Sequence, residues 1–152
     1  MDFFKKNWKW LVVALVLACL GLGIYIRNWQ FREPVLELHF FSLNKGRAIF
    51  IRAPENKTIL IGGGQNSEVI REITNAMPFY SRKIDYVLIP SAVPAQIGGL
   101  IEVIERYEVE EIIMPKLLAT STVLTQLMKE IRKKKIHTEE VERGDAIKIE
   151  EN

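Results

Sequence analysis

The chain is poor in the residues that build covalent or metal-centred chemistry. It has one cysteine, Cys19, and two histidines among 152 residues. A single thiol cannot form an internal disulfide, so a disulfide framework is excluded. Six prolines and nine glycines are too few for a collagen-like or low-complexity chain. With 48% hydrophobic and 26% charged residues, the composition is that of a globular protein. These features predict one globular domain with an additional element.

An excess of charge of one sign is also missing from most of the chain. The formal net charge is +2, and the first 33 residues alone carry +3, which leaves −1 for residues 34–152. A nucleic-acid-binding surface needs a concentration of Lys and Arg side chains that neutralise phosphates. The run Lys133–Lys135 is basic, but a solvated helix end is its simpler interpretation. We therefore expect no direct binding of nucleic acid.

One long apolar run stands out, from Trp10 to Ile26. As a helix this run spans about 25 Å at about 1.5 Å per residue, which is near the lower limit for crossing a bilayer. Four aromatic side chains flank or end the run, where amphipathic rings favour membrane interfaces: Trp8, Trp10, Tyr25 and Trp29. We predict a single-pass membrane anchor over residues 1–33. The lysines before the run favour a cytoplasmic N-terminus and an extracytoplasmic domain at the cell membrane.

Two other interpretations of this leader stay open. A charged start followed by an apolar run also has the shape of a cleaved secretory signal, although no small-x-small cleavage site follows it. The segment Val16–Cys19 is similar to a lipoprotein cleavage box, in which Cys19 would carry the lipid. The apolar run continues beyond Cys19, whereas a lipoprotein would turn polar there. A retained anchor fits the length and the flanking residues best.

The remainder of the chain, residues 34–152, is the predicted domain, because Pro34 cannot continue a helix. Short runs with strand character occur at 36–40, 48–52, 58–62, 84–90, 111–115, 138–141 and 146–149. Apolar residues at helical spacing predict helices over 69–77, 100–104 and 123–135. Three strands in a row predict an antiparallel start, and strands then alternate with helices. This order predicts an α/β domain, with a mixed sheet that carries helices on one face.

Three segments of this domain carry a family resemblance. They read FFSLNKGRAI from Phe40, TILIGGG from Thr58 and IDYVLIPSAVPAQIGGL from Ile84. The domain resembles the metallo-β-lactamase fold, in the branch found at the end of ComEC-type competence proteins. In that branch the segments read approximately FLDVGQGDA, TILIDGG and a strand leading into THPHADHIGGL. The resemblance covers nearly all of residues 36–149, and the hydrophobic frame and the glycines match well.

The resemblance implies a metal site whose ligands this chain does not have. The family motif H-x-H-x-D-H holds one or two metal ions that activate a water molecule. Aligned on IGGL at 97–100, its four ligand positions hold residues that are not ligands in the family's sense: Ser91, Val93, Ala95 and Gln96. Gly62 stands at the aspartate of the family's LIDGG segment. We therefore predict a pseudoenzyme with no catalytic residue, no metal and no cofactor.

The same positions would also suit a pocket for a small ligand. Ser91 and Gln96 would supply polar side chains, and the backbone of Gly62, Gly63 and Gly64 would supply N–H groups. The alternative is an ordered connection from a strand to a helix, in which the glycines only make the turn. Both interpretations stay open.

The resemblance also implies a partner. The family fold pairs two similar halves, and this chain ends about where the second half would begin, so we expect one half of the sandwich with an uncovered sheet face. Burial of apolar surface contributes about 25 cal/mol per Å². An open face of several hundred Å² would therefore leave many kcal/mol of favourable burial free energy unrealised. We expect a second copy of the chain, or a partner protein, to cover this face.

These features predict a non-catalytic, membrane-anchored, ComEC-related module that acts by protein association, with homodimerisation as its simplest form. Two functions of other classes stay open. One is a membrane-tethered metal-dependent hydrolase or phosphodiesterase with an atypical site. The other is a small-ligand-binding module.

Overall fold

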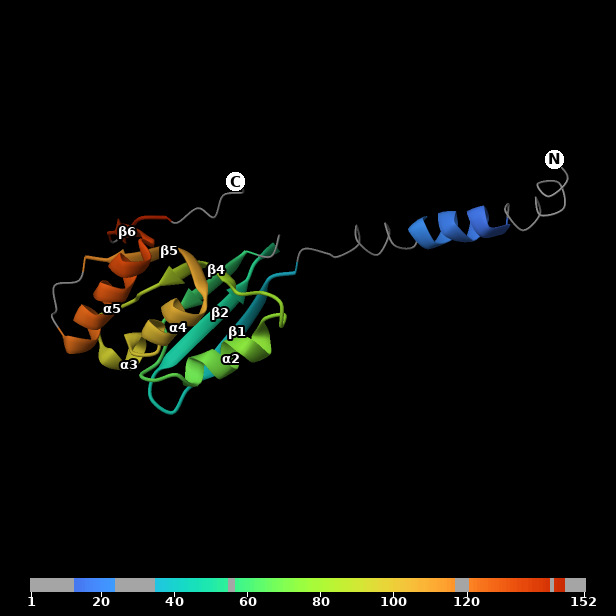
Figure 1. Ribbon diagram of the computed structural model, residues 1–152. Helices are drawn as coiled ribbons and strands as arrows, with labels where there is room; N and C mark the ends of the chain where they lie inside the picture. The colour runs from blue at the N-terminus through green and yellow to red at the C-terminus, as the bar shows by residue number, and fades with distance from the viewer. Residues whose placement is uncertain (1–12, 24–34, 55–56, 117–120, 143, 147–152) are drawn as a thin grey trace, which may run out of the picture. The chain divides into compact units, whose positions relative to one another are not determined.

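The computed structural model describes residues 13–23, 35–54, 57–116, 121–142 and 144–146 (Figure 1). The chain divides into two compact units, Met1–Val35 and Leu36–Asn152. In the first unit residues 13–23 form a helix in which every residue is exposed, including Cys19. The predicted membrane-interface residues lie outside the described residues: Trp8, Trp10, Tyr25 and Trp29.

The prediction of a membrane anchor is wrong. Within the ranges that the structure describes, no helix combines the length and the apolar character needed to cross a membrane. The single-pass topology, the extracytoplasmic domain and the cell-membrane localisation depended on that anchor, and they are withdrawn with it.

The second unit is an α/β domain built on one mixed sheet, with strand order β1-β2-β3-β4-β5-β6. The strands are β1 (Glu37–Ser42), β2 (Arg47–Arg52), β3 (Thr58–Ile61), β4 (Lys83–Leu88), β5 (Glu108–Pro115) and β6 (His137–Val141). The pairs β1–β2 and β2–β3 are antiparallel, and the pairs from β3 to β6 are parallel. The predicted strand at 146–149 lies almost entirely outside the described residues.

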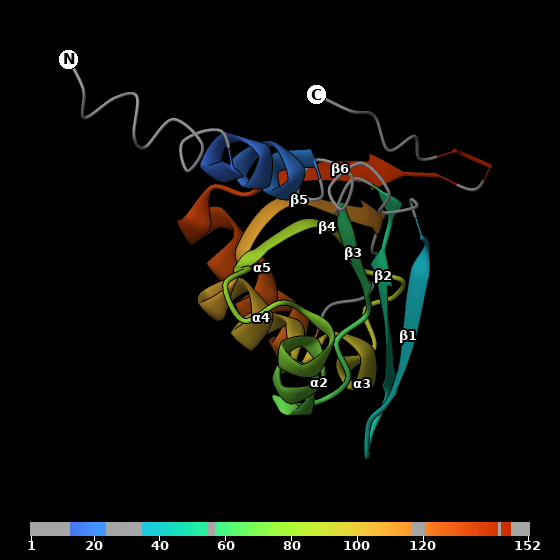
Figure 2. The ribbon, with the colours of Figure 1, turned by 90° about the vertical axis from the view of Figure 1, so that its right-hand side faces the viewer.

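Four helices connect the parallel strands: α2 (Glu68–Ala76), α3 (Pro94–Ile97), α4 (Leu100–Arg106) and α5 (Thr122–Lys134). All four lie on the same side of the sheet (Figure 2). This follows from connectivity, because successive crossovers between parallel strands take the same hand and deliver their helices to one face. The longest, α5, begins where the Ser121 side chain accepts a hydrogen bond from the Leu124 N–H at 3.1 Å. It ends at Lys135, whose φ is 55°.

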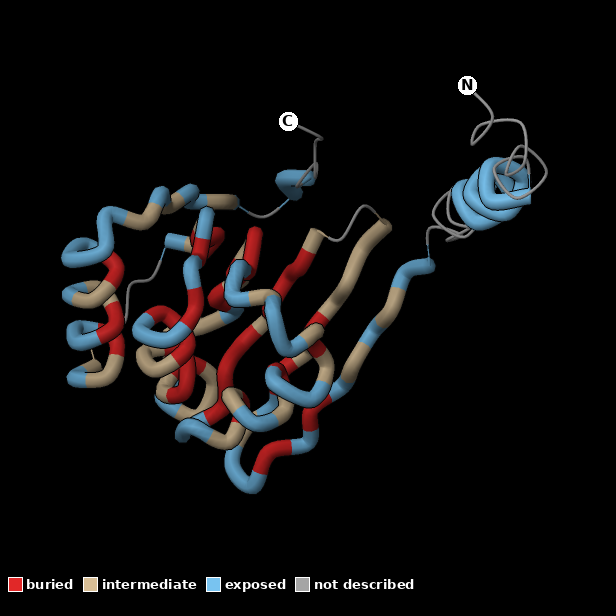
Figure 3. The backbone as a smooth tube through the Cα atoms, turned by 45° about the vertical axis from the view of Figure 1, so that its right-hand side comes forward, coloured by how far each residue is buried: buried red, intermediate tan, exposed pale blue. Residues whose placement is uncertain are grey.

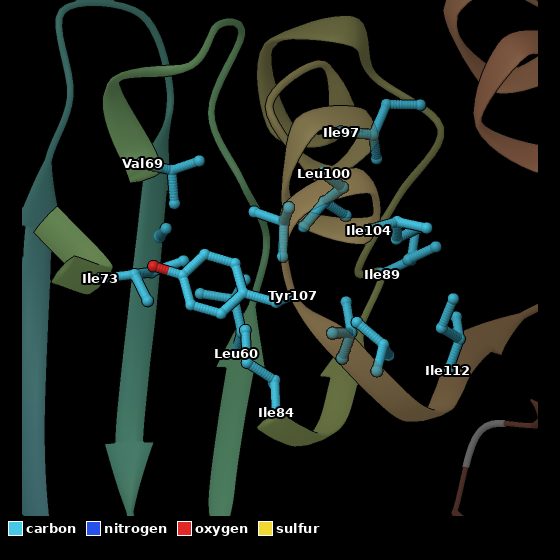
Figure 4. Close-up of a cluster of buried hydrophobic side chains, with 14 of the residues drawn as sticks. Leu60, Val69, Ile73, Ile84, Ile89, Ile97, Leu100, Ile104, Tyr107 and Ile112 are labelled. Atoms are coloured by element: carbon cyan, nitrogen blue, oxygen red, sulfur yellow. The ribbon is translucent and has the colours of Figure 1, made fainter. Parts of the chain in front are cut away.

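The hydrophobic core lies between this sheet face and the helices. Figure 3 shows burial concentrated on the central strands and on the sides of the helices that face them, whereas β1 is mostly exposed. Leu60 and Ile112 meet Val69 and Leu100 of the helices within the cluster drawn in Figure 4. Every member of the core belongs to the second unit. Residues 36–152 therefore contain the core that their fold needs, and we expect them to fold without the first unit.

A buried carboxylate joins β3 to β4 near the start of both strands. Asp85 is 6% exposed, and its Oδ2 accepts hydrogen bonds from the Thr58 N–H at 2.8 Å and from the Thr58 hydroxyl at 2.9 Å. The ammonium groups of Lys57 and Lys83 lie 3.6 and 3.5 Å from Oδ1. Burial by itself would raise the pKa of Asp85, but the two Thr58 hydrogen bonds and the two lysines outweigh it and hold the pKa below its usual value.

Candidate functional site

The loops that carry the predicted site residues lie after β3 and β4, at the carboxyl ends of neighbouring parallel strands. This is the place where open α/β sheets commonly bind ligands. Here the backbone groups of the two loops bond to one another. The Gly63 N–H donates to the Gln96 carbonyl at 2.7 Å, and the Gly99 N–H donates to the Gly64 carbonyl at 3.1 Å. The N–H of Gly62 donates to the Leu88 carbonyl at 3.0 Å. Three N–H groups of this cluster are therefore engaged within the protein.

The glycines are required by close packing. A Cβ on Gly63 would lie 2.7 Å from the side chain of Leu100, and a Cβ on Gly99 would lie 2.1 Å from the Gly63 carbonyl oxygen. Gly62, Gly63 and Gly64 are all buried. The backbones of the two loops are thus in close contact at the glycines. This close packing explains the glycine run, and no bound anion is needed to explain it.

The polar side chains predicted for the pocket do come together, but they bond to each other. The Ser91 hydroxyl donates to Gln96 Oε1 at 2.7 Å, and the Val93 N–H donates to the Ser91 oxygen at 3.3 Å. Ser91, Ala95 and Gln96 are half-buried, and Val93 is exposed. This geometry is that of an ordered loop. It gives Ser91 an amide neighbour and no base that would activate its hydroxyl.

The two histidines lie on opposite edges of the sheet. His39 belongs to β1 and His137 to β6, about 24 Å apart when neighbouring strands are spaced by about 4.8 Å. Their ring Nε2 atoms lie 3.4 Å from Glu37 and 3.5 Å from Glu111, respectively. Among the described residues, no group of three or more His, Cys, Asp or Glu side chains is placed to hold a metal ion.

A cavity of about 430 Å³ lies elsewhere, where α4 and α5 end and β4 and β5 begin. Its walls are charged, with both signs present: Arg82, Arg106 and Lys134 against Glu105, Glu108 and Glu110. These charges are partly engaged with the protein, since Lys134 Nζ donates to the Glu105 carbonyl at 3.0 Å and Glu110 pairs with Lys83 at 2.6 Å. None of the predicted pocket positions lines this cavity.

The largest unusual feature is the sheet face that points away from the four helices. Cross-strand registers define two rows of side chains on it, each with one residue from every strand. The first row, called row A, is Leu38, Ile51, Ile59, Tyr86, Glu111 and His137. The second, called row B, is Phe40, Ile49, Ile61, Leu88, Ile113 and Glu139. The apolar part of these two rows is called the open face below.

The open face is apolar from β1 to β4 in row A and from β1 to β5 in row B. Its most exposed members are at the β1 edge, where Phe40 is 73% and Leu38 48% exposed. Exposure falls along the rows away from this edge, to 7% at Ile59 on β3 and 2% at Ile113 on β5. The polar members are confined to β5 and β6, and two of them, Glu111 and His137, lie 3.5 Å apart. The exposed apolar surface is therefore concentrated at the β1 edge, and the charged members lie at the opposite side of the sheet.

The rows have a sequence signal that is easily overlooked. Leu36, Leu38 and Phe40 alternate along β1, and Ile49 and Ile51 alternate along β2, which is the two-residue period of a strand face. The opposite residues of the same strands, such as Phe41 and Phe50, form the core. Strands that are apolar on both faces are typical of sheets in which both faces are packed against other protein.

Comparisons with known proteins do not extend these observations, since no protein-family model matches the chain and no curated protein matches it.

Proposed function

We propose that the protein acts by association with protein, through the open face, and not by catalysis. The observation that carries the proposal is the pair of apolar rows that crosses the sheet on the side without α2, α3, α4 and α5. Single exposed apolar residues are ordinary on a protein surface, but a contiguous apolar area with a polar border is typical of an interface. The resemblance to the metallo-β-lactamase fold without its ligand residues agrees with this class of function.

The energetic argument is the unrealised burial. Each large apolar side chain gains about 1.5–3 kcal/mol when it passes from water into a packed interior. Phe40 has most of that gain still available and Leu38 about half of it, because they are 73% and 48% exposed. When a partner protein covers the open face, this free energy of burial is gained. When the open face stays in water, the chain is prone to aggregate.

The loop residues favour the same conclusion. Ser91 and Gln96 bond to each other, and the N–H groups of Gly62, Gly63 and Gly99 bond to carbonyl groups. A substrate or ligand would have to displace these bonds before it could form its own. The open face requires no such exchange.

The test is the light-scattering mass of the full chain, purified under mild conditions from the cells that naturally make it. We expect a complex of defined stoichiometry with a mass well above the 17.5 kDa of one chain. In the double variant Leu38→Ser/Phe40→Ser that complex should be lost, since serine removes both exposed anchors of the open face.

The matched control is Phe79→Ser. Phe79 is 91% exposed and lies in the loop between α2 and β4, so its replacement removes a similar apolar area away from the open face. The complex should persist in this variant. A monomeric wild-type chain would contradict the proposal, and so would stoichiometric zinc or manganese accompanied by phosphodiester turnover.

A further inference from the structure

We infer that the outer edge of β1 pairs with β1 of a second copy of this chain, antiparallel, about a two-fold axis that is perpendicular to the sheet and passes between the two Leu38 residues. The inference goes beyond the proposed function, because it concerns the backbone edge of one strand and the partner that this edge fits.

The two edges of the sheet differ in how well they are protected against pairing. Natural sheets protect an edge with short strands, bulges, prolines or charged side chains, above all lysine. The β6 edge carries His137, Glu139 and Glu140 within five residues. β1 has no proline, lysine or arginine over Glu37–Ser42, and its register with β2 is one to one, without a bulge. Among the described residues β2 is the only strand that pairs with β1, so the other edge of β1 is open to a further strand (Figure 2).

The side chains of β1 indicate which strand this edge fits. The five residues from Leu36 to Phe40 are, in order, apolar, acidic, apolar, basic and apolar, so they are complementary to themselves about Leu38. In an antiparallel pair centred there, Glu37 lies opposite His39 of the other copy, and Leu36 lies opposite Phe40. Each contact occurs twice, and cross-strand pairs of both kinds stabilise a sheet. A strand of unrelated sequence would match these positions only by chance, whereas a second copy matches all of them.

Registers centred on the neighbouring residues give poorer matches. Side chains alternate between the two faces of a strand, so the faces of both copies stay continuous only when a residue lies on the axis. An axis through Glu37 would set two carboxylates opposite each other. An axis through His39 would set two imidazoles opposite each other, and one through Phe40 would set His39 opposite Phe41. Like groups of one charge at opposite positions destabilise a sheet, so the Leu38 register is favoured.

The acidic and basic side chains of β1 are accessible to the other copy. Glu37 and His39 are each 38% exposed, and within one chain the His39 Nε2 atom lies 3.4 Å from the Glu37 carboxylate. Arg52 on β2 pairs with the same carboxylate from the inner side. In the dimer each carboxylate therefore lies between Arg52 of its own chain and the imidazole of the other copy.

This pairing also accounts for the place of the exposed apolar surface. An axis perpendicular to the sheet keeps the helices of both copies on one side and both open faces on the other. Leu38 and Phe40, which are 48% and 73% exposed, then lie in the middle of one joined face and not at its border. A protein that binds the open face would contact both copies.

Engineered cysteines test the register in the full chain with Cys19→Ser, produced alone, which has no other cysteine. In Leu38→Cys the two new side chains lie directly opposite each other, at a Cα separation of about 4.5–5.5 Å that suits a disulfide. We expect a disulfide-linked dimer as the main product in a glutathione redox buffer.

The matched control is Phe40→Cys. Position 40 is more exposed than position 38, but its two copies lie about 14 Å apart along the strands, which is too far for a disulfide. The yield of linked dimer should be at most about a tenth of that from Leu38→Cys. Mixing Phe40→Cys chains with Leu36→Cys chains should restore the disulfide, because these two positions face each other.

A charge exchange tests the same contact without cysteine. His39→Glu sets two carboxylates opposite each other at both symmetric positions, so the dissociation constant measured by sedimentation should rise about tenfold or more. The exchanged variant Glu37→His/His39→Glu restores both pairs and should return the dissociation constant to within about threefold of wild type. The thermal midpoint of each variant, measured at high dilution, shows that the chain is folded.

The inference and the proposed function fail in different ways. Equal disulfide yields from Leu38→Cys and Phe40→Cys would overturn the inference, and so would a chain that is monomeric at every concentration when made alone. The proposed function would still stand if the complex from the natural cells held another polypeptide and was lost in Leu38→Ser/Phe40→Ser. A chain that is monomeric when purified from its natural cells would overturn both.

Discussion

The two faces of the sheet carry the same kinds of side chain in different surroundings. On the helix side one cross-strand row is Phe50, Leu60, Val87 and Ile112, all of them fully buried. One position further along these strands, the open face presents Ile49, Ile61, Leu88 and Ile113. Residue type does not distinguish the rows. What differs is that four helices cover the whole of the first row, whereas in the second row Ile113 is buried and the other three are only half-buried. This is the reason to look for a partner that covers the second row.

The loops and the open face differ in the same way. The loops after β3 and β4 are closed, with glycine backbones in contact and the polar side chains paired. The open face is unpaired apolar surface at the β1 edge. The resemblance would place a site in these loops, but there the protein's own backbone and side chains bond to one another. The exposed apolar surface lies at the β1 edge instead.

The largest effect is expected from Leu60→Ala, compared with its neighbour Ile61→Ala. Leu60 is fully buried under the helices, so its truncation should lower the free energy of unfolding by about 2–5 kcal/mol through lost transfer and a cavity. Ile61 is half-buried on the open face, and its truncation should cost the dilute, monomeric chain less than half as much. Urea unfolding measures both. Equal losses would mean that the two faces are equally well packed.

A smaller loss, of about 1–3 kcal/mol, is expected from Gly99→Ala, because the new methyl group would lie 2.1 Å from the Gly63 carbonyl oxygen. The backbone has to shift to accept it. If the loops instead opened into a ligand pocket, the methyl group would enter free space and stability would hardly change. Urea unfolding distinguishes closed loops from an open pocket. The control is Thr125→Ala on the exposed side of α5, for which the free energy of unfolding should change by no more than about 0.5 kcal/mol.

Next in size is Asp85→Asn, which removes a buried charge on the closed side of the molecule. We expect a loss of about 1–2 kcal/mol at neutral pH, because the carboxylate accepts two Thr58 hydrogen bonds and faces two lysines. The folded pKa of Asp85 is lowered from a reference value of 3.8. The stabilisation is therefore complete above that value and is lost as pH falls through the lower, folded pKa.

The difference in unfolding free energy between wild type and Asp85→Asn should accordingly be constant from pH 7 to about pH 5 and shrink below about pH 4. Urea unfolding at a series of pH values measures it. A difference that grows on acidification would mean that the carboxyl is protonated in the folded protein, with its pKa raised and not lowered.

The periodic elements could be predicted from the sequence, because each rests on local pattern. Val69 and Ile73 are four apart on one helix face, and the glycines after β3 mark its end. The helix α3 was missed, since a single turn that begins at Pro94 shows no period. The anchor was predicted from an apolar run alone, whereas no helix among the described residues is long and apolar enough to cross a membrane.

Contacts between residues far apart in the chain could not be predicted, because no local sequence pattern indicates them. Asp85 and Thr58 are 27 positions apart, so the bond between them depends on β3 lying beside β4. The pairing of Ser91 with Gln96 likewise depends on how the loop folds back. The open face was expected from the resemblance as a surface, but its residues emerge only from the strand registers.

The smallest effect is expected at the charged border of the open face. His137→Gln removes a contact with Glu111 in which the His137 side chain is 75% exposed, and even a charged pair that is this exposed contributes only about 0–1 kcal/mol. Unfolding of the dilute chain should therefore change by no more than that. Because the exposed apolar side chains lie at the β1 edge, the complex expected from the proposed function should persist in His137→Gln. Light scattering measures its mass. A loss of the complex as large as that in Leu38→Ser/Phe40→Ser would place β6 inside the contact.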